Sequence, residues 1–529
     1  MKRTLLTAIL LTALLHVSTD LHGVITSRPR LAVIITVDGL QGGCLSAFMP
    51  KFGTGGFRRI ITGGAYNPNG KCAYIPSGKC SDYASLSAGT VPAYHGMVAD
   101  RFFSTLDEEV ISALDDARYE SINSALTLSP RNLQTTTIAD ELKLADPRSR
   151  VYSIGLDPES AILMGGHLAD CALWIDNGTA LVATSKYYDD GLPDWAAKIN
   201  TDNTVGLQMA RFWSPDIDMS SYMFPARTVP SFTGARPIFY QMDATATVEE
   251  QVRSFKRTPN VNAVIKALAI RALRDEALGS DNSPDLLCVE FNARHANEGY
   301  GLCAETEDMY LSLDRTIGEL LDAIDISVGL DNVVIVLTGN HIEQSSPQRL
   351  ASSRINSGTF NASRTMALLN SYLMALYGQG RWVSGYYARN IHLNRRLIED
   401  SGIDFDEIQS AAARLMLEFT GVHTAYTESR IQYVSGSDND MATKLRNGHF
   451  KNRSGDVVFT LMPGWFEVDS EGNNIGVTSR FQSNVPIAVM GYEIPAGRTS
   501  MWYEDIVPTL CRILEIPAPN GTTGDAVEF

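Results

Sequence analysis

Residues 31–40 read LAVIITVDGL, an apolar run that ends at Asp38 and Gly39. The run is rich in β-branched residues and shows little polar alternation, as expected for a strand that is buried on both faces. Five similar runs follow along the chain, at 151–156, 285–290, 332–337, 457–461 and 486–490. We therefore expect Asp38 to stand at the end of a central strand.

Segments with helical periodicity separate these runs, at 54–61, 136–144, 261–278, 305–326, 405–419 and 503–514. The alternation predicts an α/β fold with a mainly parallel sheet between two layers of helices. In such a fold, active residues gather where strands end. Residues from about 165 to 250, rich in Trp, Tyr, Pro and Asp, are predicted to form an inserted cap within one domain over 24–529. No linker marks a second domain.

The start of the chain resembles a secretory signal peptide of about residues 1–23. Met1-Lys2-Arg3 is basic, and 4–17 is an apolar run too short to cross a bilayer. An uncleaved anchor is the alternative. No later run is long and apolar enough for a transmembrane segment, so we predict a periplasmic or secreted chain.

The composition limits the partners and the redox chemistry. Asp and Glu number 60 against 44 Lys and Arg, a net charge of −16 that disfavours nucleic-acid binding. The seven cysteines form no C-x-x-C pattern. In an oxidising compartment some could pair, and Cys72 and Cys80 are the nearest couple, but an odd number leaves at least one thiol unpaired.

Several phrases occur in the order known from one protein family. They are Asp38-Gly39, 84–90 (ASLSAGT), 92–96 (PAYHG), 165–176 (GGHLADCALWID), Glu305 with Asp308, Tyr310, Leu313 and Asp314, 337–341 (LTGNH), 453–458 (RSGDVV) and 517–521 (PAPNG). Together they resemble the type I phosphodiesterase/nucleotide pyrophosphatase branch of the alkaline phosphatase superfamily. Within it they are most similar to periplasmic alkaline phosphatases that use a Thr nucleophile.

The resemblance implies a two-zinc site for phosphoryl transfer, in which a hydroxyl attacks phosphorus and cations stabilise the phosphate oxygens. At the nucleophile position, the spacing between Pro76 and Ala84 places Lys79, which has no hydroxyl. Asp38 matches a metal ligand. The next two ligand positions read Ala293 and Asn297, and the Asp-His pair at a strand end reads Asn340-His341.

The remaining family positions are also altered. The last ligand histidine is missing from 476–484. The phosphate-binding Lys-x-Arg reads Asp157-Pro158-Glu159, and a phosphate-contacting Asn is Asp100, so acidic groups that repel phosphate replace cations. Nearby His295 is expected to be an exposed loop residue rather than a ligand. Asp38 and His341 alone are then too few donors for two zinc ions, and we expect no cofactor, or at most one weakly held divalent metal.

We interpret the chain as a catalytically degenerate homologue with a binding or scaffold role in the periplasm, whose protein or ligand partner is not identified by the sequence. One alternative is a divergent phosphate-ester hydrolase with a single metal at Asp38 and His341, or with Ser77 or Cys80 as nucleophile. Another is a sugar- or peptide-binding protein that uses the cap. If the metals are lost, Lys79 is expected to pair with Asp38, with Asn340 and His341 supplying neutral hydrogen bonds.

Overall fold

Strand β1 (Leu31–Asp38) is buried along its whole length. It pairs in parallel with β12 (Asp285–Asn292) on one side and with β13 (Val333–Gly339) on the other. The computed structural model describes residues 28–529 apart from 76–77, 105–107, 228–230, 234–235, 297–301, 341–349, 352, 434–435, 437–439 and 469–483. Within it, the expected position of Asp38 at the end of a central strand is confirmed.

The central sheet has eleven strands, and its middle is parallel, as the sequence predicted. Strand β20 pairs antiparallel with β13, and β9 with β8. The order across the sheet is β21 (Gly497–Arg498), β2 (Ala65–Lys71), β20 (Asn484–Gly491), β13, β1, β12, β7 (Val151–Ile154), β8 (Cys171–Ile175), β9 (Val182–Ser185), β5 (Asp115–Ile122) and β6 (Thr127–Leu128).

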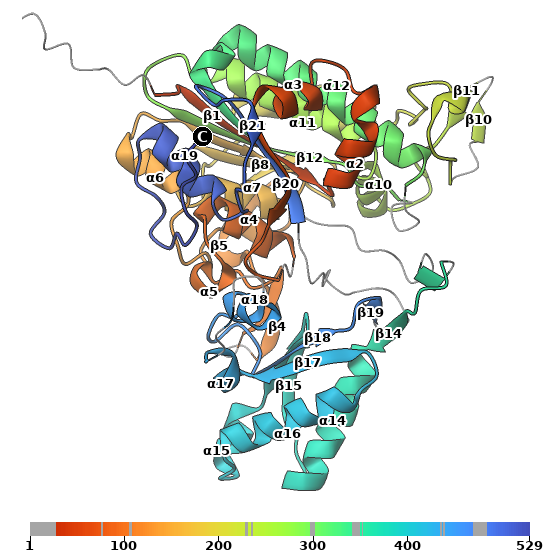
Figure 1. Cartoon of the computed structure of the whole chain (residues 1–529), viewed down its shortest axis with the longest axis vertical. Helices are drawn as coiled ribbons and strands as arrows, with labels where there is room; N and C mark the ends of the chain where they lie inside the picture. The colour runs from red at the N-terminus through yellow and green to blue at the C-terminus, as the bar shows by residue number, and fades with distance from the viewer. Residues whose placement is uncertain are drawn as a thin grey trace, which may run out of the picture.

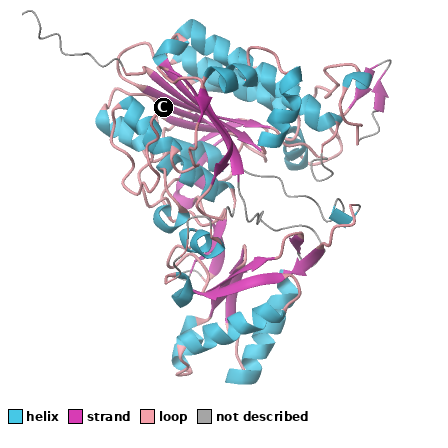
Figure 2. Ribbon diagram, in the orientation of Figure 1, coloured by secondary structure: helices cyan, strands magenta, loops and turns pink. Residues whose placement is uncertain are grey.

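Helices cover both faces of this sheet (Figure 1; Figure 2). Alternate β1 side chains enter opposite cores, Val33 and Ile35 on one side and Ala32 and Ile34 on the other. This is why the strand has no polar face. The first core is covered by α2 (Gly42–Phe48), α3 (Phe57–Gly63), α11 (Asn260–Asp275) and α12 (Ala304–Ser327), the second by α4 (Lys79–Ala88), α6 (Ile138–Ala145), α7 (Pro158–Gly165) and α19 (Ile506–Leu514).

A second lobe has its own hydrophobic core (Figure 1). Its four-stranded sheet contains 457–461, which form a strand as expected but do not belong to the central sheet. The apolar pattern of a buried strand does not specify its neighbours, so this placement was wrong. The lobe consists of α14 (Ala362–Tyr377), β15 (Val383–Tyr387), β16 (Asn390–Leu393), α15 (Arg395–Asp400), α16 (Phe405–Glu418), β17 (Val422–Thr427) and β18 (Val457–Leu461).

The range predicted as a cap, 165–250, overlaps the sheet. Its first part supplies β8 and β9, which pair with the central strands. The rest lies beyond the sheet and includes a hairpin that projects to one side (Figure 1). It contains α8 (Asp194–Thr201), α9 (Thr204–Met209), β10 (Ser231–Thr233), β11 (Arg236–Ile238) and the start of α10 (Val248–Phe255).

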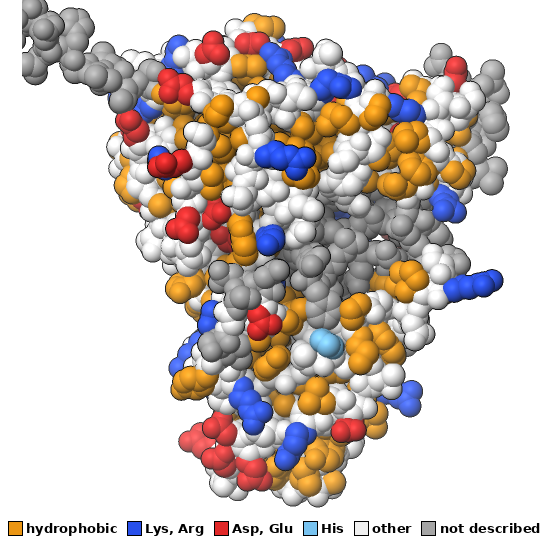
Figure 3. Space-filling view, viewed as in Figure 1, with side chains coloured by type: hydrophobic (Ala, Val, Ile, Leu, Met, Phe, Trp, Pro, Cys, Tyr) orange, Lys and Arg blue, Asp and Glu red, His pale blue; other side chains and the backbone are white. Residues whose placement is uncertain are grey.

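The surface and the cysteines bear on the other expectations. Basic and acidic side chains are interspersed over the face shown in Figure 3.

All seven cysteines lie in the described part of the chain, where each is buried and none forms a disulfide, so Cys72 and Cys80 are not paired. Among the described residues, no helix is long and apolar enough to cross a membrane. The predicted signal peptide lies outside them.

Candidate functional site

Lys79 is the first residue of α4, and the turn before it is shaped by glycine. Gly78 has φ 148°, and a Cβ there would lie 2.4 Å from the Asp100 carboxylate. Because glycine leaves this space open, Asp100 accepts a hydrogen bond from the Cys80 N–H at 2.8 Å. Asp100, expected at a former phosphate position, therefore holds the start of α4.

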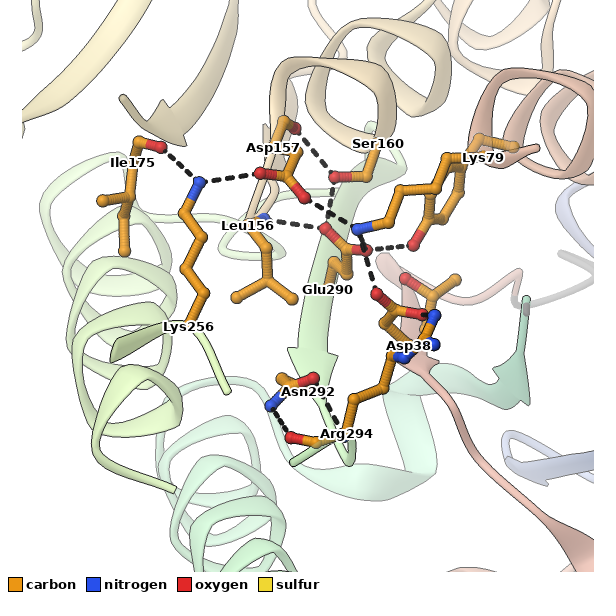
Figure 4. A network of polar contacts seen from close by, with 12 residues as sticks. Asp38, Lys79, Leu156, Asp157, Ser160, Ile175, Lys256, Glu290, Asn292 and Arg294 are labelled. Carbon is orange, nitrogen blue, oxygen red and sulfur yellow. Dashed lines mark hydrogen bonds and ion pairs between the residues drawn. The ribbon is translucent and has the colours of Figure 1, made fainter. Parts of the chain in front are cut away.

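The Lys79 ammonium lies among three carboxylates (Figure 4). Its Nζ is 3.0 Å from Asp38, 2.7 Å from Asp157 and 3.5 Å from Glu290. Burial alone would lower the pKa of Lys79, but the charges of Asp157, Asp38 and Glu290 outweigh it and hold that pKa well above its ordinary value. The expected ion pair between Lys79 and Asp38 is confirmed, within a larger network.

Asp157 is held between two lysines, since Lys256 also contacts it at 2.7 Å and donates to the Ile175 carbonyl at 2.7 Å. Although burial opposes ionisation, Lys256 and Lys79 lower the pKa of Asp157 below its usual range. The expectation that Asp157 repels phosphate stays a prediction, and in the structure its carboxylate pairs with Lys79 and Lys256. Glu159 differs, since burial and then the charges of Asp157 and Asp100 raise its pKa to about 7.

Glu290 is the main part of the site that sequence reasoning missed. It is 2% exposed on β12, and it accepts hydrogen bonds from the Leu156 N–H at 2.7 Å and from the Tyr83 and Ser160 hydroxyls. Burial is the largest influence on its pKa, which is raised. The sequence did carry a signal for Glu290, which is an acid at the end of the apolar run 285–290. A carboxylate buried in such a strand needs hydrogen-bond or ion-pair partners.

Arg294 lies across the end of β1, and it too was missed. Its Nη1 is 3.8 Å from Asp38 Oδ1. Gly39 has φ 81°, and a Cβ there would come within 2.5 Å of Arg294 Cγ, so this approach depends on glycine. The neighbouring Ala293 N–H donates to the Asp38 carbonyl at 2.9 Å. Ala293 therefore lies beside Asp38, as the family register implied, but offers no ligand atom.

His295 is 2% exposed, so the expectation of an exposed loop histidine was wrong. The loop after β12 turns under α12, where His295 Nε2 lies 2.8 Å from the Thr306 hydroxyl and the ring packs edge-on against Trp213. Asp308 of the same helix accepts a hydrogen bond from Trp213 Nε1 at 2.6 Å. Helix α12 thus anchors the segment that covers the site.

Asn340, directly after the end of strand β13, does not make the contacts that the sequence predicted within the described part of the chain. Asn340 is 4% exposed, and neither of its side-chain amide atoms has a hydrogen-bond partner among the described residues. The hydrogen bonds expected from Asn340 are therefore not found within this part of the chain. His341, Asn297 and Ser77 lie outside the described residues.

The described residues do not fit a pair of zinc ions. Of the former metal positions that the structure describes, Asp38 alone offers a carboxylate, and Lys79 occupies the space beside it. Among these residues, no group of three or more His, Cys, Asp or Glu side chains is placed to hold a metal ion. Zinc needs several such donors, and an ammonium repels a cation.

Comparison with known proteins identifies the family to which the chain belongs. A model of the type I phosphodiesterase/nucleotide pyrophosphatase family matches residues 32–485. The chain belongs to this family. It lies within the alkaline phosphatase superfamily.

The similarity to known relatives extends over nearly the whole length of each chain. A protein named calcium-transporting ATPase from Myroides odoratus is 27% identical, over 95% of this chain and 94% of the relative. Alkaline phosphatase PafA from Elizabethkingia meningoseptica is 25% identical, over 94% of each chain. The crystal structure of wild-type PafA superposes with a TM-score of 0.84 at 23% identity, covering 94% of this chain and 98% of that one, and so shows the same fold.

Proposed function

We propose that this chain is a catalytically inactive member of its family that serves as a binding or scaffold protein in the periplasm or outside the cell. The observation that carries the proposal is the position of the Lys79 ammonium, 3.0 Å from Asp38. In the family this region holds cations that activate a hydroxyl. Here a side chain supplies the positive charge that Asp38 requires, and no metal is needed to compensate that charge.

The nucleophile position supports the same proposal. Lys79 carries no hydroxyl, and its raised pKa keeps it a charged ammonium, which has no lone pair with which to attack phosphorus. Cys80, an alternative nucleophile, is 1% exposed. Burial, followed by the charges of Asp100 and Glu159, raises the pKa of Cys80 well above its ordinary value, so the thiol stays protonated.

The experiment is turnover of 4-nitrophenyl phosphate and bis(4-nitrophenyl) phosphate with added zinc. The wild-type chain is expected to give the same rate as Asp38→Ala purified identically, because neither holds a catalytic metal pair. The matched preparation separates true turnover from a contaminating phosphatase. Turnover by the wild type that Asp38→Ala abolishes would establish an active enzyme and end the proposal.

A further inference from the structure

A cavity of about 620 Å³ adjoins the Lys79 network, because Lys79 and Asp157 form part of its wall. This volume is in the range of small-molecule sites. The rest of the wall comes from the start of α7, the end of β8 with the turn after it, and residues 124–126. It includes Glu159, which like Asp157 stands where the family resemblance places a phosphate-binding cation.

Negative charge predominates on this wall. Its carboxylates are Asp157, Glu159, Asp176 and Glu249, and Lys79 is the one basic residue that lines it among those described. The charge of Lys79 is already shared by three carboxylates of its own network. Lys79 therefore does not neutralise the rest of the wall.

Two of the four carboxylates are compensated by cations and two are not. Asp157 lies 2.7 Å from both Lys79 and Lys256, and Glu249 pairs with Arg253 at 2.5 Å. Among the described residues, no ion pair is formed by the other two carboxylates, Glu159 and Asp176. The cavity is thus left with an excess of negative charge.

Glu159 in particular lies among like charges. It is half-buried at the start of α7, and burial, followed by the charges of Asp157 and Asp100, raises its pKa to about 7. Carboxylates this close together oppose each other's ionisation. A cation bound beside Glu159 relieves this repulsion, so the cavity favours a positively charged ligand.

The end of β8 adds hydrogen-bonding groups that the protein leaves unused. Asp176 is 5% exposed, and its Oδ1 accepts from the Gly178 and Thr179 N–H groups at 2.9 Å, while no partner of its Oδ2 is found among the described residues. Asn177 Oδ1 and Trp174 Nε1 are buried and also lack a partner within this part of the chain. All three side chains line the cavity. Because unsatisfied buried polar groups are costly, a ligand that pairs with them is favoured.

We infer that this cavity binds a small organic cation, a primary ammonium on a hydroxylated body. The ammonium donates to Glu159, Asp176 and Asn177, since it carries three N–H donors. A hydroxyl of the ligand accepts from the Trp174 indole N–H. The charge of the phosphate pocket that the family resemblance implies is thereby inverted. The inference rests on the proposed function and deepens it, because it names the class of ligand that an inactive family member binds.

The test is calorimetric titration of the full chain with glucamine, the primary amine of sorbitol. It is performed at pH 8, where Glu159, with its pKa of about 7, is mostly ionised. Sorbitol is the matched neutral probe, because it differs only by a hydroxyl in place of the ammonium. We expect saturable binding of one glucamine per chain, and binding of sorbitol that is weaker by about tenfold or more.

Two substitutions remove charge and preserve shape. Glu159→Gln and Asp176→Asn should each weaken glucamine binding by about tenfold and reduce its advantage over sorbitol. Asp176→Asn keeps an Oδ1 acceptor for the turn at 178–179. Asp322→Asn is the control, because the Asp322 side chain is 68% exposed, pairs with Arg59 and does not line the cavity. Unchanged thermal unfolding midpoints show that the variants are folded.

The outcomes separate this inference from the proposed function. If the wild type shows no saturable glucamine binding, or binds glucamine and sorbitol equally, the inference is overturned without recourse to any variant. Equal glucamine affinity in the wild type and in both folded carboxylate variants overturns it as well. Neither result touches the proposed function, which is overturned instead by phosphatase turnover that Asp38→Ala abolishes.

Discussion

Replacing Lys79 by Met removes the ammonium at the centre of the network but keeps a stem of similar length. Asp38, Asp157 and Glu290 then lose a cation that lies 3.0, 2.7 and 3.5 Å away. Removing one partner of a buried pair typically costs roughly 3–5 kcal/mol. Lys256 remains on Asp157, and Arg294 remains 3.8 Å from Asp38. We therefore expect a loss of about 3 kcal/mol, at the lower end of that range.

The assay is urea unfolding of Lys79→Met and of the wild type at pH 7. Lys79 has a raised folded-state pKa, so its stabilisation is fully present below its ordinary pKa of 10.5 and is lost only as the pH rises through the higher folded value. Lys143→Met is the matched control. Lys143 is 19% exposed, like Lys79 at 20%, but among the described residues its one ion pair is with Asp170, which is 35% exposed, so about 1 kcal/mol or less is expected. A loss at Lys79 no larger than at Lys143 would refute the reasoning.

Two further substitutions test a glycine beside the site and a buried carboxylate elsewhere in the fold. Gly39→Ala should destabilise the protein by roughly 1–3 kcal/mol in thermal unfolding, because φ at Gly39 is 81° and the new Cβ meets Arg294 Cγ at 2.5 Å. The control is Gly43→Ala, where nothing lies within 4 Å of the new Cβ. An equal loss of stability in the two variants would contradict the prediction. Burial raises the pKa of Glu504 from 4.5 to about 7, so its native form binds more protons between these values and stability falls as the pH rises through that window. Glu504→Gln should remove up to roughly 3 kcal/mol of this dependence between pH 5 and 8 in urea unfolding, and an unchanged pH profile would argue against it.

The sequence predicted the central part of the fold because parallel strands buried on both faces are apolar throughout, as β1 and β12 are. It did not predict the second lobe. Residues 457–461 have the same apolar character as the central strands, and periodicity specifies burial but not the partner strand. The strands β8 and β9 lay within the expected cap for a related reason, because short strands next to polar loops give a weak signal.

The site was predicted in part. The Lys79–Asp38 pair followed from motif spacing together with the cost of burying a lone carboxylate. The contacts of Lys256 with Asp157 and of Arg294 with Asp38 join residues 99 and 256 positions apart, and no local pattern in the sequence indicates them. The burial of His295 likewise depends on helix α12, which begins nine residues later.

The central claim is that Lys79 stands in place of the family's metal ions. Its most direct test is the zinc content of the purified mature protein, measured by elemental analysis after dialysis against trace zinc and then against zinc-free buffer. The described donors predict far less than one equivalent of zinc per chain, in the wild type and in Asp38→Ala alike. Two tightly held equivalents in the wild type, lost in Asp38→Ala, would contradict the claim.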